Sequence, residues 1–335
     1  MLASASRKHP RGAISFLKVE VLNVFWLIVA ALAVIVAAVY VTAYICYRMA
    51  FLAQPGQVSE FPEGEIYEPF YPAMAQWAKE TKALPQERVS IKSFDGLTLQ
   101  GIFYEFAPGA PIELMFHGYR GSAQRDLSGG VQRCFKLGRS CLLVDQRASG
   151  ESEGKVITFG IHEHKDCLAW VDFLVKKFGP DVTIILTGVS MGAATVLMAA
   201  GHPLPENVLG VLADCSYSSP KEIIQKVIGD MGLPKKLSYP FVKLGAKVYG
   251  GFDLEEYSPM EAMATCTVPV IFFHGEEDQY VPCRMSRRLH RACRAPKRIV
   301  TIPKAGHGLC YPVGGEYYLQ PLREFFGPKA SYGEE

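Results

Sequence analysis

A serine between two glycines is the residue most suited to chemistry in this chain of 335 residues. The motif Gly188-Val-Ser190-Met-Gly192 follows an apolar run, Val182–Leu186, and precedes a run of small and apolar residues, Ala193–Ala200. Glycines at these positions let a strand turn sharply into a helix, and such a turn lifts the serine hydroxyl above the sheet edge at a helix N-terminus. A glycine-rich turn with an incidental serine is the alternative. The order strand, motif, helix predicts that Ser190 is a nucleophile on a nucleophile elbow.

A serine hydroxyl needs a base, and the base needs a carboxylate that orients it. After a strand-to-helix serine of this kind, the carboxylate and then the histidine follow in chain order, each in a loop after a strand. His307 lies between glycines in Ala305-Gly306-His307-Gly308, beyond the predicted strand Ile299–Ile302. We therefore expect His307 to be the general base. Taken alone, it could also be a solvated loop histidine.

The orienting carboxylate has several candidates. Glu276, Glu277 and Asp278 follow the predicted strand Val268–Phe273, and Asp214 ends the strand before it. Only one of these side chains needs to reach the imidazole. Pattern alone leaves the choice open.

An acyl-transfer site also needs two backbone N–H groups aimed at the developing oxyanion. Met191 follows the nucleophile and is the first expected donor. Tyr119, in the glycine-containing loop His117–Gly121 after the predicted strand Ile112–Phe116, is the second. His117 itself is expected to be structural.

The sequence gives little indication of a metal site, a disulfide framework or nucleic-acid binding. The run His162-Glu163-His164 resembles a metal cluster, but residues two apart on a helix point in different directions. The nine cysteines form no CxxC pair, and most are expected to be buried. A formal net charge of +2 gives no electrostatic case for nucleic acid. We expect no metal and no organic cofactor, and we expect Arg147 to form structural ion pairs.

Strands and helices must alternate to position these residues. A hairpin is predicted around Asp95-Gly96, because alternating apolar residues flank a DG turn. Short apolar strands separated by helical patterns then predict an α/β fold with a mostly parallel central sheet covered on both faces. The further predicted elements are strands at Ser140–Val144 and Val208–Ala213 and helices at Ala73–Thr81, Ile161–Phe178, Arg284–Cys293 and Tyr317–Phe326. The stretch 216–267 interrupts the rhythm and is predicted to be a small helical cap; an ordinary surface excursion is the alternative.

The N-terminal region is not globular in pattern. Val21–Tyr47 contains no charged residue and is long enough to cross a bilayer as a helix, whereas the apolar part of a signal peptide is much shorter. Arg7, Lys8, Arg11 and Lys18 precede this run, and Arg48 follows it. The positive-inside rule then predicts a single-pass membrane protein with its catalytic domain outside the cytoplasm. Eight cysteines on that side argue against this orientation.

The predicted organisation has five parts: a cytoplasmic tail (1–20), a transmembrane helix (21–47), a juxtamembrane linker (48–85), the catalytic domain (86–328) and a C-terminal tail (329–335). Because every motif lies beyond Glu87, removal of residues 1–50 is expected to leave an active enzyme.

The chain resembles the α/β-hydrolase superfamily over roughly Glu87 to Phe326. In particular it is similar to membrane-anchored bacterial α/β-hydrolases related to the serine aminopeptidase and monoglyceride lipase branch. The resemblance is carried by GVSMG (Gly188–Gly192) and five further blocks in order: DGLTLQG (Asp95–Gly101), FHGYRGS (Phe116–Ser122), DQRASGES (Asp145–Ser152), HGEEDQYVP (His274–Pro282) and AGH (Ala305–His307).

This resemblance implies that Asp278, the aspartate of the HGxxDxxVP block, is the triad acid, with Asp214 as the fallback. It implies an α/β-hydrolase fold and a serine hydrolase that cleaves carboxyl esters, carboxylesterase-like or lipase-like, through an acyl-enzyme. Ser149 departs from the pattern, because many relatives have histidine there, so no substrate is transferred from a relative. The expected partners are a small-molecule or lipid acyl ester and, through the N-terminal helix, the membrane. A peptidase or aminopeptidase of the same fold and a non-catalytic anchored scaffold are the competing functions.

Overall fold

A central sheet of eight strands organises the part of the chain after residue 86, in the order β1-β2-β4-β3-β5-β6-β7-β8. The computed structural model describes residues 11–53 and 61–327, and gives side-chain detail from Glu20 onward. β2 runs antiparallel to β1 and β4, and all other neighbours are parallel, as predicted. The strands are β1 (Glu87–Lys92), β2 (Thr98–Tyr104), β3 (Ile112–Phe116), β4 (Ser140–Val144), β5 (Ile184–Val189), β6 (Val208–Asp214), β7 (Val270–Gly275) and β8 (Lys297–Ile302).

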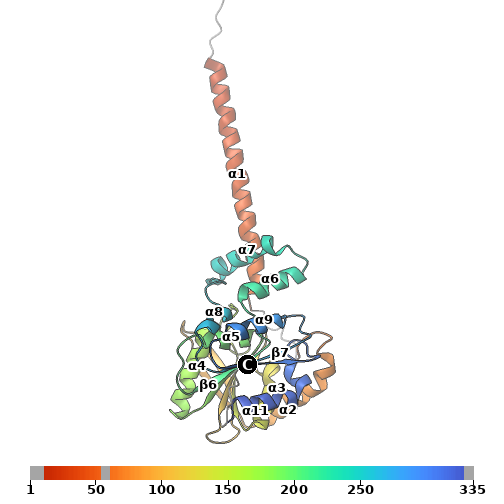
Figure 1. The fold of residues 1–335 in the computed structure, drawn as a ribbon. Coiled ribbons are helices and arrows are strands. Elements are labelled where there is room, and N and C mark those ends of the chain that lie inside the picture. Colours follow the sequence, from red (N-terminus) through yellow and green to blue (C-terminus); the bar gives the residue numbers. More distant parts are fainter. Residues whose placement is uncertain (1–10, 54–60, 328–335) are drawn as a thin grey trace, which may run out of the picture.

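Helices cover both faces of this sheet (Figure 1). The central strands are buried on both sides, which is why they are mainly apolar along their length instead of alternating between apolar and polar residues. One face carries α4 (Glu163–Phe178), α5 (Met191–Ala199), α8 (Pro259–Thr265) and α9 (Arg284–Ala292). The other carries α3 (Ala123–Lys136), α10 (Cys310–Gly314) and α11 (Glu316–Phe325), with α2 (Tyr71–Ala83) packed on α3 and preceded by the short helix η1 (Glu68–Phe70).

Helix α3 was not expected from the sequence. Two consecutive glycines, Gly129 and Gly130, interrupt its pattern, and glycine costs up to about 1 kcal/mol in a helix interior. Both allow close packing: a Cβ on Gly129 would lie 2.8 Å from the ring of Trp77, and one on Gly130 would lie 2.2 Å from Met115 Cε. The two glycines, which prevented the prediction of this helix from sequence, are therefore explained by its close contacts with Trp77 and Met115.

The predicted cap region is helical, but its C-terminal part does not belong to the cap. Helices α6 (Pro220–Asp230) and α7 (Lys235–Gly245) and the π-helical turn η2 (Ala246–Gly250) lie between α1 and the rest of the domain (Figure 1). Helix α8, which falls inside the predicted 216–267, instead packs on α5 in the helix layer of the sheet. We call α6, α7 and η2 the cap from here on.

The N-terminal helix is longer than predicted. Helix α1 (Arg11–Ala50) projects as a rod from the domain (Figure 1), so the predicted tail 1–20 is helical from residue 11 and the helix passes the expected end at Tyr47. Of the predicted tails, residues 1–10 and 329–335 lie outside the described residues.

The predicted linker 48–85 is not a separate connector in its described parts. Phe51 is fully buried, and its ring packs edge-on against Phe159 and Phe252. Leu52 pairs with Val156 in an isolated β-bridge. The expectation that residues 1–50 are dispensable stays a prediction, and it has to account for the last turn of α1, which leads directly into the packed interior of the domain.

Candidate active site

The predicted nucleophile occupies a strained turn between β5 and α5. Ser190 has φ 57° and ψ −116°, a conformation that side chains rarely adopt. The two glycines of its motif are required by backbone contacts: a Cβ on Gly188 would lie 2.2 Å from the carbonyl carbon of Gly192, and one on Gly192 would lie 2.1 Å from the Phe116 oxygen. The Ser190 N–H donates to the Asp214 carbonyl at 2.8 Å, which ties the turn to β6.

The structure brings Ser190, His307 and Asp278 into one hydrogen-bonded chain. Ser190 Oγ lies 2.9 Å from His307 Nε2, and His307 Nδ1 lies 2.7 Å from Asp278 Oδ2. The other carboxylate oxygen accepts from the N–H groups of Tyr280 and Val281 at 2.9 and 2.7 Å. These backbone donors fix the carboxylate, and the carboxylate in turn fixes the imidazole with Nε2 toward the hydroxyl.

Asp278 has a second histidine partner that sequence reasoning did not assign to the site. His274, fully buried, places Nε2 3.3 Å from Asp278 Oδ2 and 2.8 Å from the Val281 carbonyl. Burial opposes the charged form of Asp278, but the hydrogen bonds from His274 and His307 outweigh it and hold the pKa of this carboxyl below its ordinary value. The only signal in the sequence is the spacing of four between His274 and Asp278.

The other candidate carboxylates have different partners. Asp214 Oδ2 accepts from the Tyr318 hydroxyl at 3.0 Å, and burial raises the pKa of Asp214. Glu276 accepts from Thr301 at 2.7 Å. In the part of the chain that the structure describes, Asp278 is thus the predicted acid that reaches His307.

The loop after β3 lies beside the nucleophile. A Cβ on Gly118 would lie 3.6 Å from Ser190 Cβ, and Tyr119 lines the same cavity as Ser190. Met191 is the first residue of α5, where a backbone N–H has no acceptor within the helix. His117 accepts from the Gln146 N–H at 3.0 Å, which confirms its structural role.

This loop also holds the end of α1. The Tyr119 hydroxyl donates to the Ala50 carbonyl at 2.8 Å, and the Arg120 guanidinium donates to the Met49 carbonyl at 2.7 Å. A cation at the C-terminus of a helix also favours the helix dipole. The expected oxyanion loop and the N-terminal helix are therefore directly joined.

A cavity of about 750 Å³ opens at the nucleophile. One wall is formed by residues 62–67 and α2, which the sequence placed in a linker, and another by α3 and α10. Tyr67 lines it close to Asp278, and burial raises the pKa of the Tyr67 phenol, which keeps it a proton donor. In the sequence, the only indication that residues 62–77 form a cavity wall is the high number of aromatic residues between Phe61 and Trp77. Its main apolar lining residues are Ile66, Tyr67, Met74, Trp77, Met115 and Tyr311.

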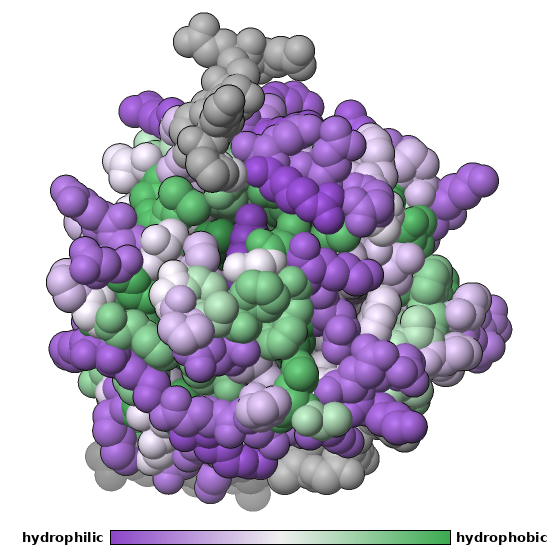
Figure 2. Space-filling view, turned by 90° about the horizontal axis from the view of Figure 1, so that it is seen from below, coloured by the Kyte–Doolittle hydropathy of each residue, from purple (hydrophilic) through white to green (hydrophobic). Residues whose placement is uncertain are grey.

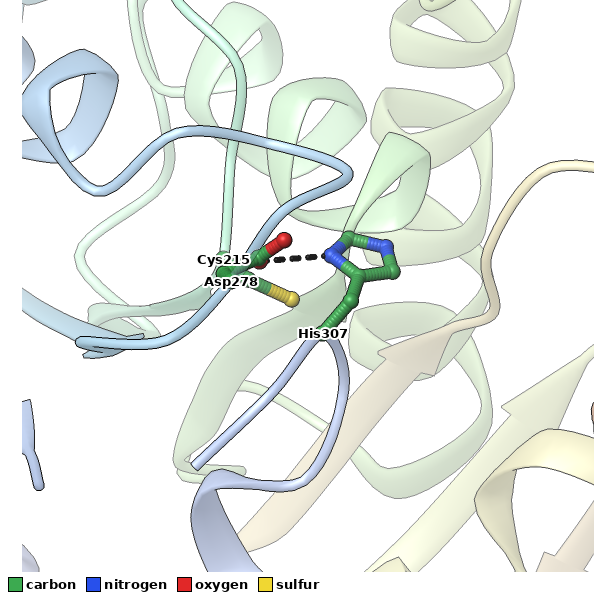
Figure 3. Close-up of side chains that lie close together, drawn as sticks. All are labelled: Cys215, Asp278 and His307. Atoms are coloured by element: carbon green, nitrogen blue, oxygen red, sulfur yellow. Dashed lines mark hydrogen bonds and ion pairs between the residues drawn. The ribbon is translucent and has the colours of Figure 1, made fainter. Parts of the chain in front are cut away.

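Cys215 lies close to His307, and its presence in the site was not predicted from the sequence. Its thiol and the Asp278 carboxylate both extend toward the His307 ring (Figure 3), and the three potential ligand atoms lie within 4.8 Å of one another. Burial raises the pKa of the Cys215 thiol far above its usual range, so the thiol is neutral in this environment. A neutral thiol suits a packing role here.

Two further expectations concerned charged side chains away from the nucleophile. Glu163, of the run that resembles a metal cluster, accepts from the backbone N–H groups of Thr158 and Gly160. Arg147 forms a buried ion pair with Asp166 at 2.7 Å and a second ion pair with the exposed Asp95 at 2.9 Å, as predicted. These groups hold loops together and lie outside the cavity.

Comparison with known proteins agrees with this architecture. A family model described as the alpha/beta hydrolase fold matches residues 114–239. The esterase Pf2001 of Pyrococcus furiosus superposes with a TM-score of 0.63 at 21% identity, over 82% of this chain and 97% of the esterase. Est1E of Butyrivibrio proteoclasticus, in a structure with ferulic acid, gives 0.55 at 20% identity, over 71% and 97% of the two chains. The family model and the superpositions agree on the α/β-hydrolase fold for this chain.

Similar sequences occur in bacteria and fungi. The chain is 28% identical to the Bacillus subtilis protein YqkD over 190 residues, which are 56% of this chain and 62% of YqkD, so the match covers less than two thirds of that relative. It is 24% identical to the protein bem46 of Schizosaccharomyces pombe over 271 residues, 76% of this chain and 83% of bem46.

Proposed function

We propose that this chain is a membrane-anchored serine hydrolase that cleaves carboxylic esters, with Ser190 as nucleophile, His307 as general base and Asp278 as the orienting acid. The observation that supports this most is the hydrogen-bonded chain from Ser190 Oγ through His307 to Asp278, of which Ser190 and His307 line a large, mainly apolar cavity. Apolar lining favours the acyl part of an ester over a charged peptide terminus. The fold of the esterase neighbours is consistent with it.

The proposed reaction has two steps. His307 Nε2 accepts the Ser190 proton while Oγ attacks the ester carbonyl, and the N–H groups of Met191 and Tyr119 stabilise the oxyanion. Collapse of the intermediate releases the alcohol, which takes the proton from His307, and leaves an acyl-enzyme. Water then attacks the acyl group with His307 again as base, and the carboxylic acid leaves. Every group needed for these steps belongs to the protein or to water.

Labelling with a fluorophosphonate probe tests the nucleophile. We expect the wild type to react and to hydrolyse p-nitrophenyl esters, and Ser190→Ala to lose both properties while its thermal unfolding is unchanged. Ser90→Ala, at an exposed serine in β1, is the matched control and should behave as wild type. Wild-type labelling of Ser190→Ala would overturn the assignment. A series of acyl chain lengths, together with aminoacyl-peptide substrates, then separates an esterase from a peptidase.

Helix α1 supports membrane anchoring. Its stretch Glu20–Ala50 is long and apolar enough to cross a bilayer, and the apolar side chains of its exposed part have no protein partner to cover them. The extracytoplasmic placement of the domain stays a prediction, and two features weigh against it. Lys235 and Lys236 of the cap lie at the same end of α1 as Arg48, which reduces the charge difference between the flanks. All nine cysteines are free, as is typical of reducing compartments.

Protease treatment of intact cells decides the side. Digestion of the catalytic domain in intact cells is the result that the positive-inside rule predicts. Protection until lysis would place the domain in the cytoplasm and direct the search for substrates there.

A further inference from the structure

The cap carries large apolar side chains that no part of the described protein covers. Leu233 is 46% exposed, Leu237 67% and Val248 45%. They come from α7 and its two ends, and Met231, 54% exposed, extends the same segment. Other apolar residues of α7, among them Tyr239 and Val242, are buried, so the helix is amphipathic in its packing.

The inner side of this segment packs on α1. A Cβ on Gly245 would lie 2.4 Å from the Ala43 carbonyl oxygen, so backbone meets backbone there. The Tyr249 hydroxyl donates to the Tyr40 carbonyl at 3.2 Å, and its ring packs edge-on against Tyr44 at 5.1 Å. The cap therefore contacts α1 along the stretch that begins at Tyr40.

The position of this contact along α1 determines how deep the cap would lie relative to a membrane that α1 crosses. A helix from Val21 to Tyr40 rises about 30 Å, which is the thickness of the hydrocarbon core of a bilayer. If α1 crosses a membrane from Val21, Tyr40 reaches the boundary between hydrocarbon and headgroups, where tyrosine is enriched. The cap then lies level with the headgroups.

Charge on the same segment suits an anionic lipid surface. Residues 232–252 contain four lysines and no acidic residue. Lys243 is paired with Asp253 and Glu255, while the described structure gives no ion pair to Lys235 or Lys236. Long lysine stems beside exposed leucines are typical of helices that lie in a membrane interface.

We propose that residues 231–249 dock on the membrane that α1 crosses, with lipid headgroups and upper acyl chains as the partner. This rests on the proposed membrane anchoring and adds a second, peripheral contact beside the span. On the face away from α1, hydrophilic side chains dominate the rim and apolar ones gather toward the centre (Figure 2). Helix α6 of the cap contributes Lys226 and Asp230 to the lining of the cavity, so docking fixes the cavity at a constant distance from lipid.

Photo-crosslinking of the full-length protein in nanodiscs tests the proposal. The discs contain phosphatidylcholine and phosphatidylglycerol, and p-benzoylphenylalanine replaces Leu237 in the cap, Leu32 in the span or Tyr317 on α11. Tyr317 is a matched control, because it is 59% exposed on a helix remote from α1 (Figure 1). We expect lipid adducts by mass spectrometry from positions 237 and 32, each several-fold above position 317. Unchanged unfolding temperatures verify that the variants are folded.

The three positions separate the possible failures. Adducts from position 32 without adducts from position 237 would overturn docking and leave anchoring intact. No adduct from position 32 would contradict the anchoring itself. Crosslinks from position 237 to a second copy of the chain would assign the surface to self-association instead of lipid. In the double variant Lys235→Glu/Lys236→Glu, the adduct yield from position 237 should fall several-fold. An unchanged yield would show that these two lysines do not contribute to the contact with lipid.

Discussion

Asp278 accepts hydrogen bonds from the backbone of its own loop and from two histidines while it lies buried. Its pKa is held below the ordinary value, so the carboxyl is ionised at neutral pH. A fixed negative charge at Nδ1 selects the tautomer that leaves Nε2 free to accept the Ser190 proton.

Replacement of this acid should therefore cost turnover more than folding. We predict that Asp278→Asn lowers kcat by on the order of 10⁴, the size of effect seen when an orienting aspartate is lost. Asp214→Asn is the comparison variant, because Asp214 bonds to Tyr318 and not to His307. It should retain most of the kcat and change only the unfolding temperature. Steady-state hydrolysis of a p-nitrophenyl ester measures both; the reverse pattern would show that the acid is misassigned.

At this scale the sequence was informative where the chemistry is local. Ser190 and His307, which the structure places within hydrogen-bond distance, could be proposed as a pair because the turn, the chain order and the glycine flanks are all encoded next to them. Asp278 could be chosen among its neighbours only through the resemblance to a family. Tyr67 and Trp77 could not be assigned to the cavity, because their position depends on the packing of a distant segment against α3.

At the scale of elements, glycines mark where helices approach one another. In α7, a Cβ on Gly245 would meet the backbone of α1, which cannot move without displacing the helix. In α6, a Cβ on Gly229 would meet only the flexible end of the Lys235 side chain. The same substitution therefore has opposite consequences in the two helices.

We predict that Gly245→Ala destabilises the protein by about 1–3 kcal/mol, the usual cost of overpacking. Gly229→Ala, its matched control, should be neutral or stabilise by up to about 1 kcal/mol through helix propensity. Thermal unfolding in detergent micelles measures both. Equal midpoints for the two variants would mean that α7 and α1 are not in close contact.

The elements themselves were predictable to different degrees. The buried parallel strands and helices α4, α9 and α11 have strong apolar patterns, and they were predicted within a few residues of their observed ends. Helix α3 was missed because its two glycines are explained only by contacts with Trp77 and Met115. The last turn of α1 was missed because a hydropathy pattern does not distinguish a membrane contact from a contact with the cap.

At the scale of the whole molecule, α1 is both an extension and a part of the domain. Tyr47 packs on Tyr249 of the cap, and Phe51 is buried against Phe159 and Phe252. Tyr119 and Arg120 bond to carbonyls at the C-terminus of α1. We therefore predict that a chain lacking residues 1–39 keeps its unfolding temperature and its reaction with fluorophosphonate. A chain lacking residues 1–52 should lose the burial of Phe51, worth about 1.5–3 kcal/mol, together with the contacts to the oxyanion loop.

Purified truncated chains, compared by calorimetry and probe labelling, test this prediction. Equal stability and labelling of the two chains would restore the simpler view that everything before residue 53 is a tether. Reduced labelling of the shorter chain at temperatures where it remains folded would show that the end of α1 supports the site itself.

The contact between Tyr40 and Tyr249 joins residues 209 positions apart, and this has a consequence for biosynthesis. The ribosome releases α1 early, long before the cap has been translated. An anchor inserted during synthesis would wait in the lipid with Tyr47 and Phe51 unprotected on its emerging end. The nascent domain would then have to complete its fold around a helix that can no longer diffuse freely, at the membrane surface and not in bulk solvent.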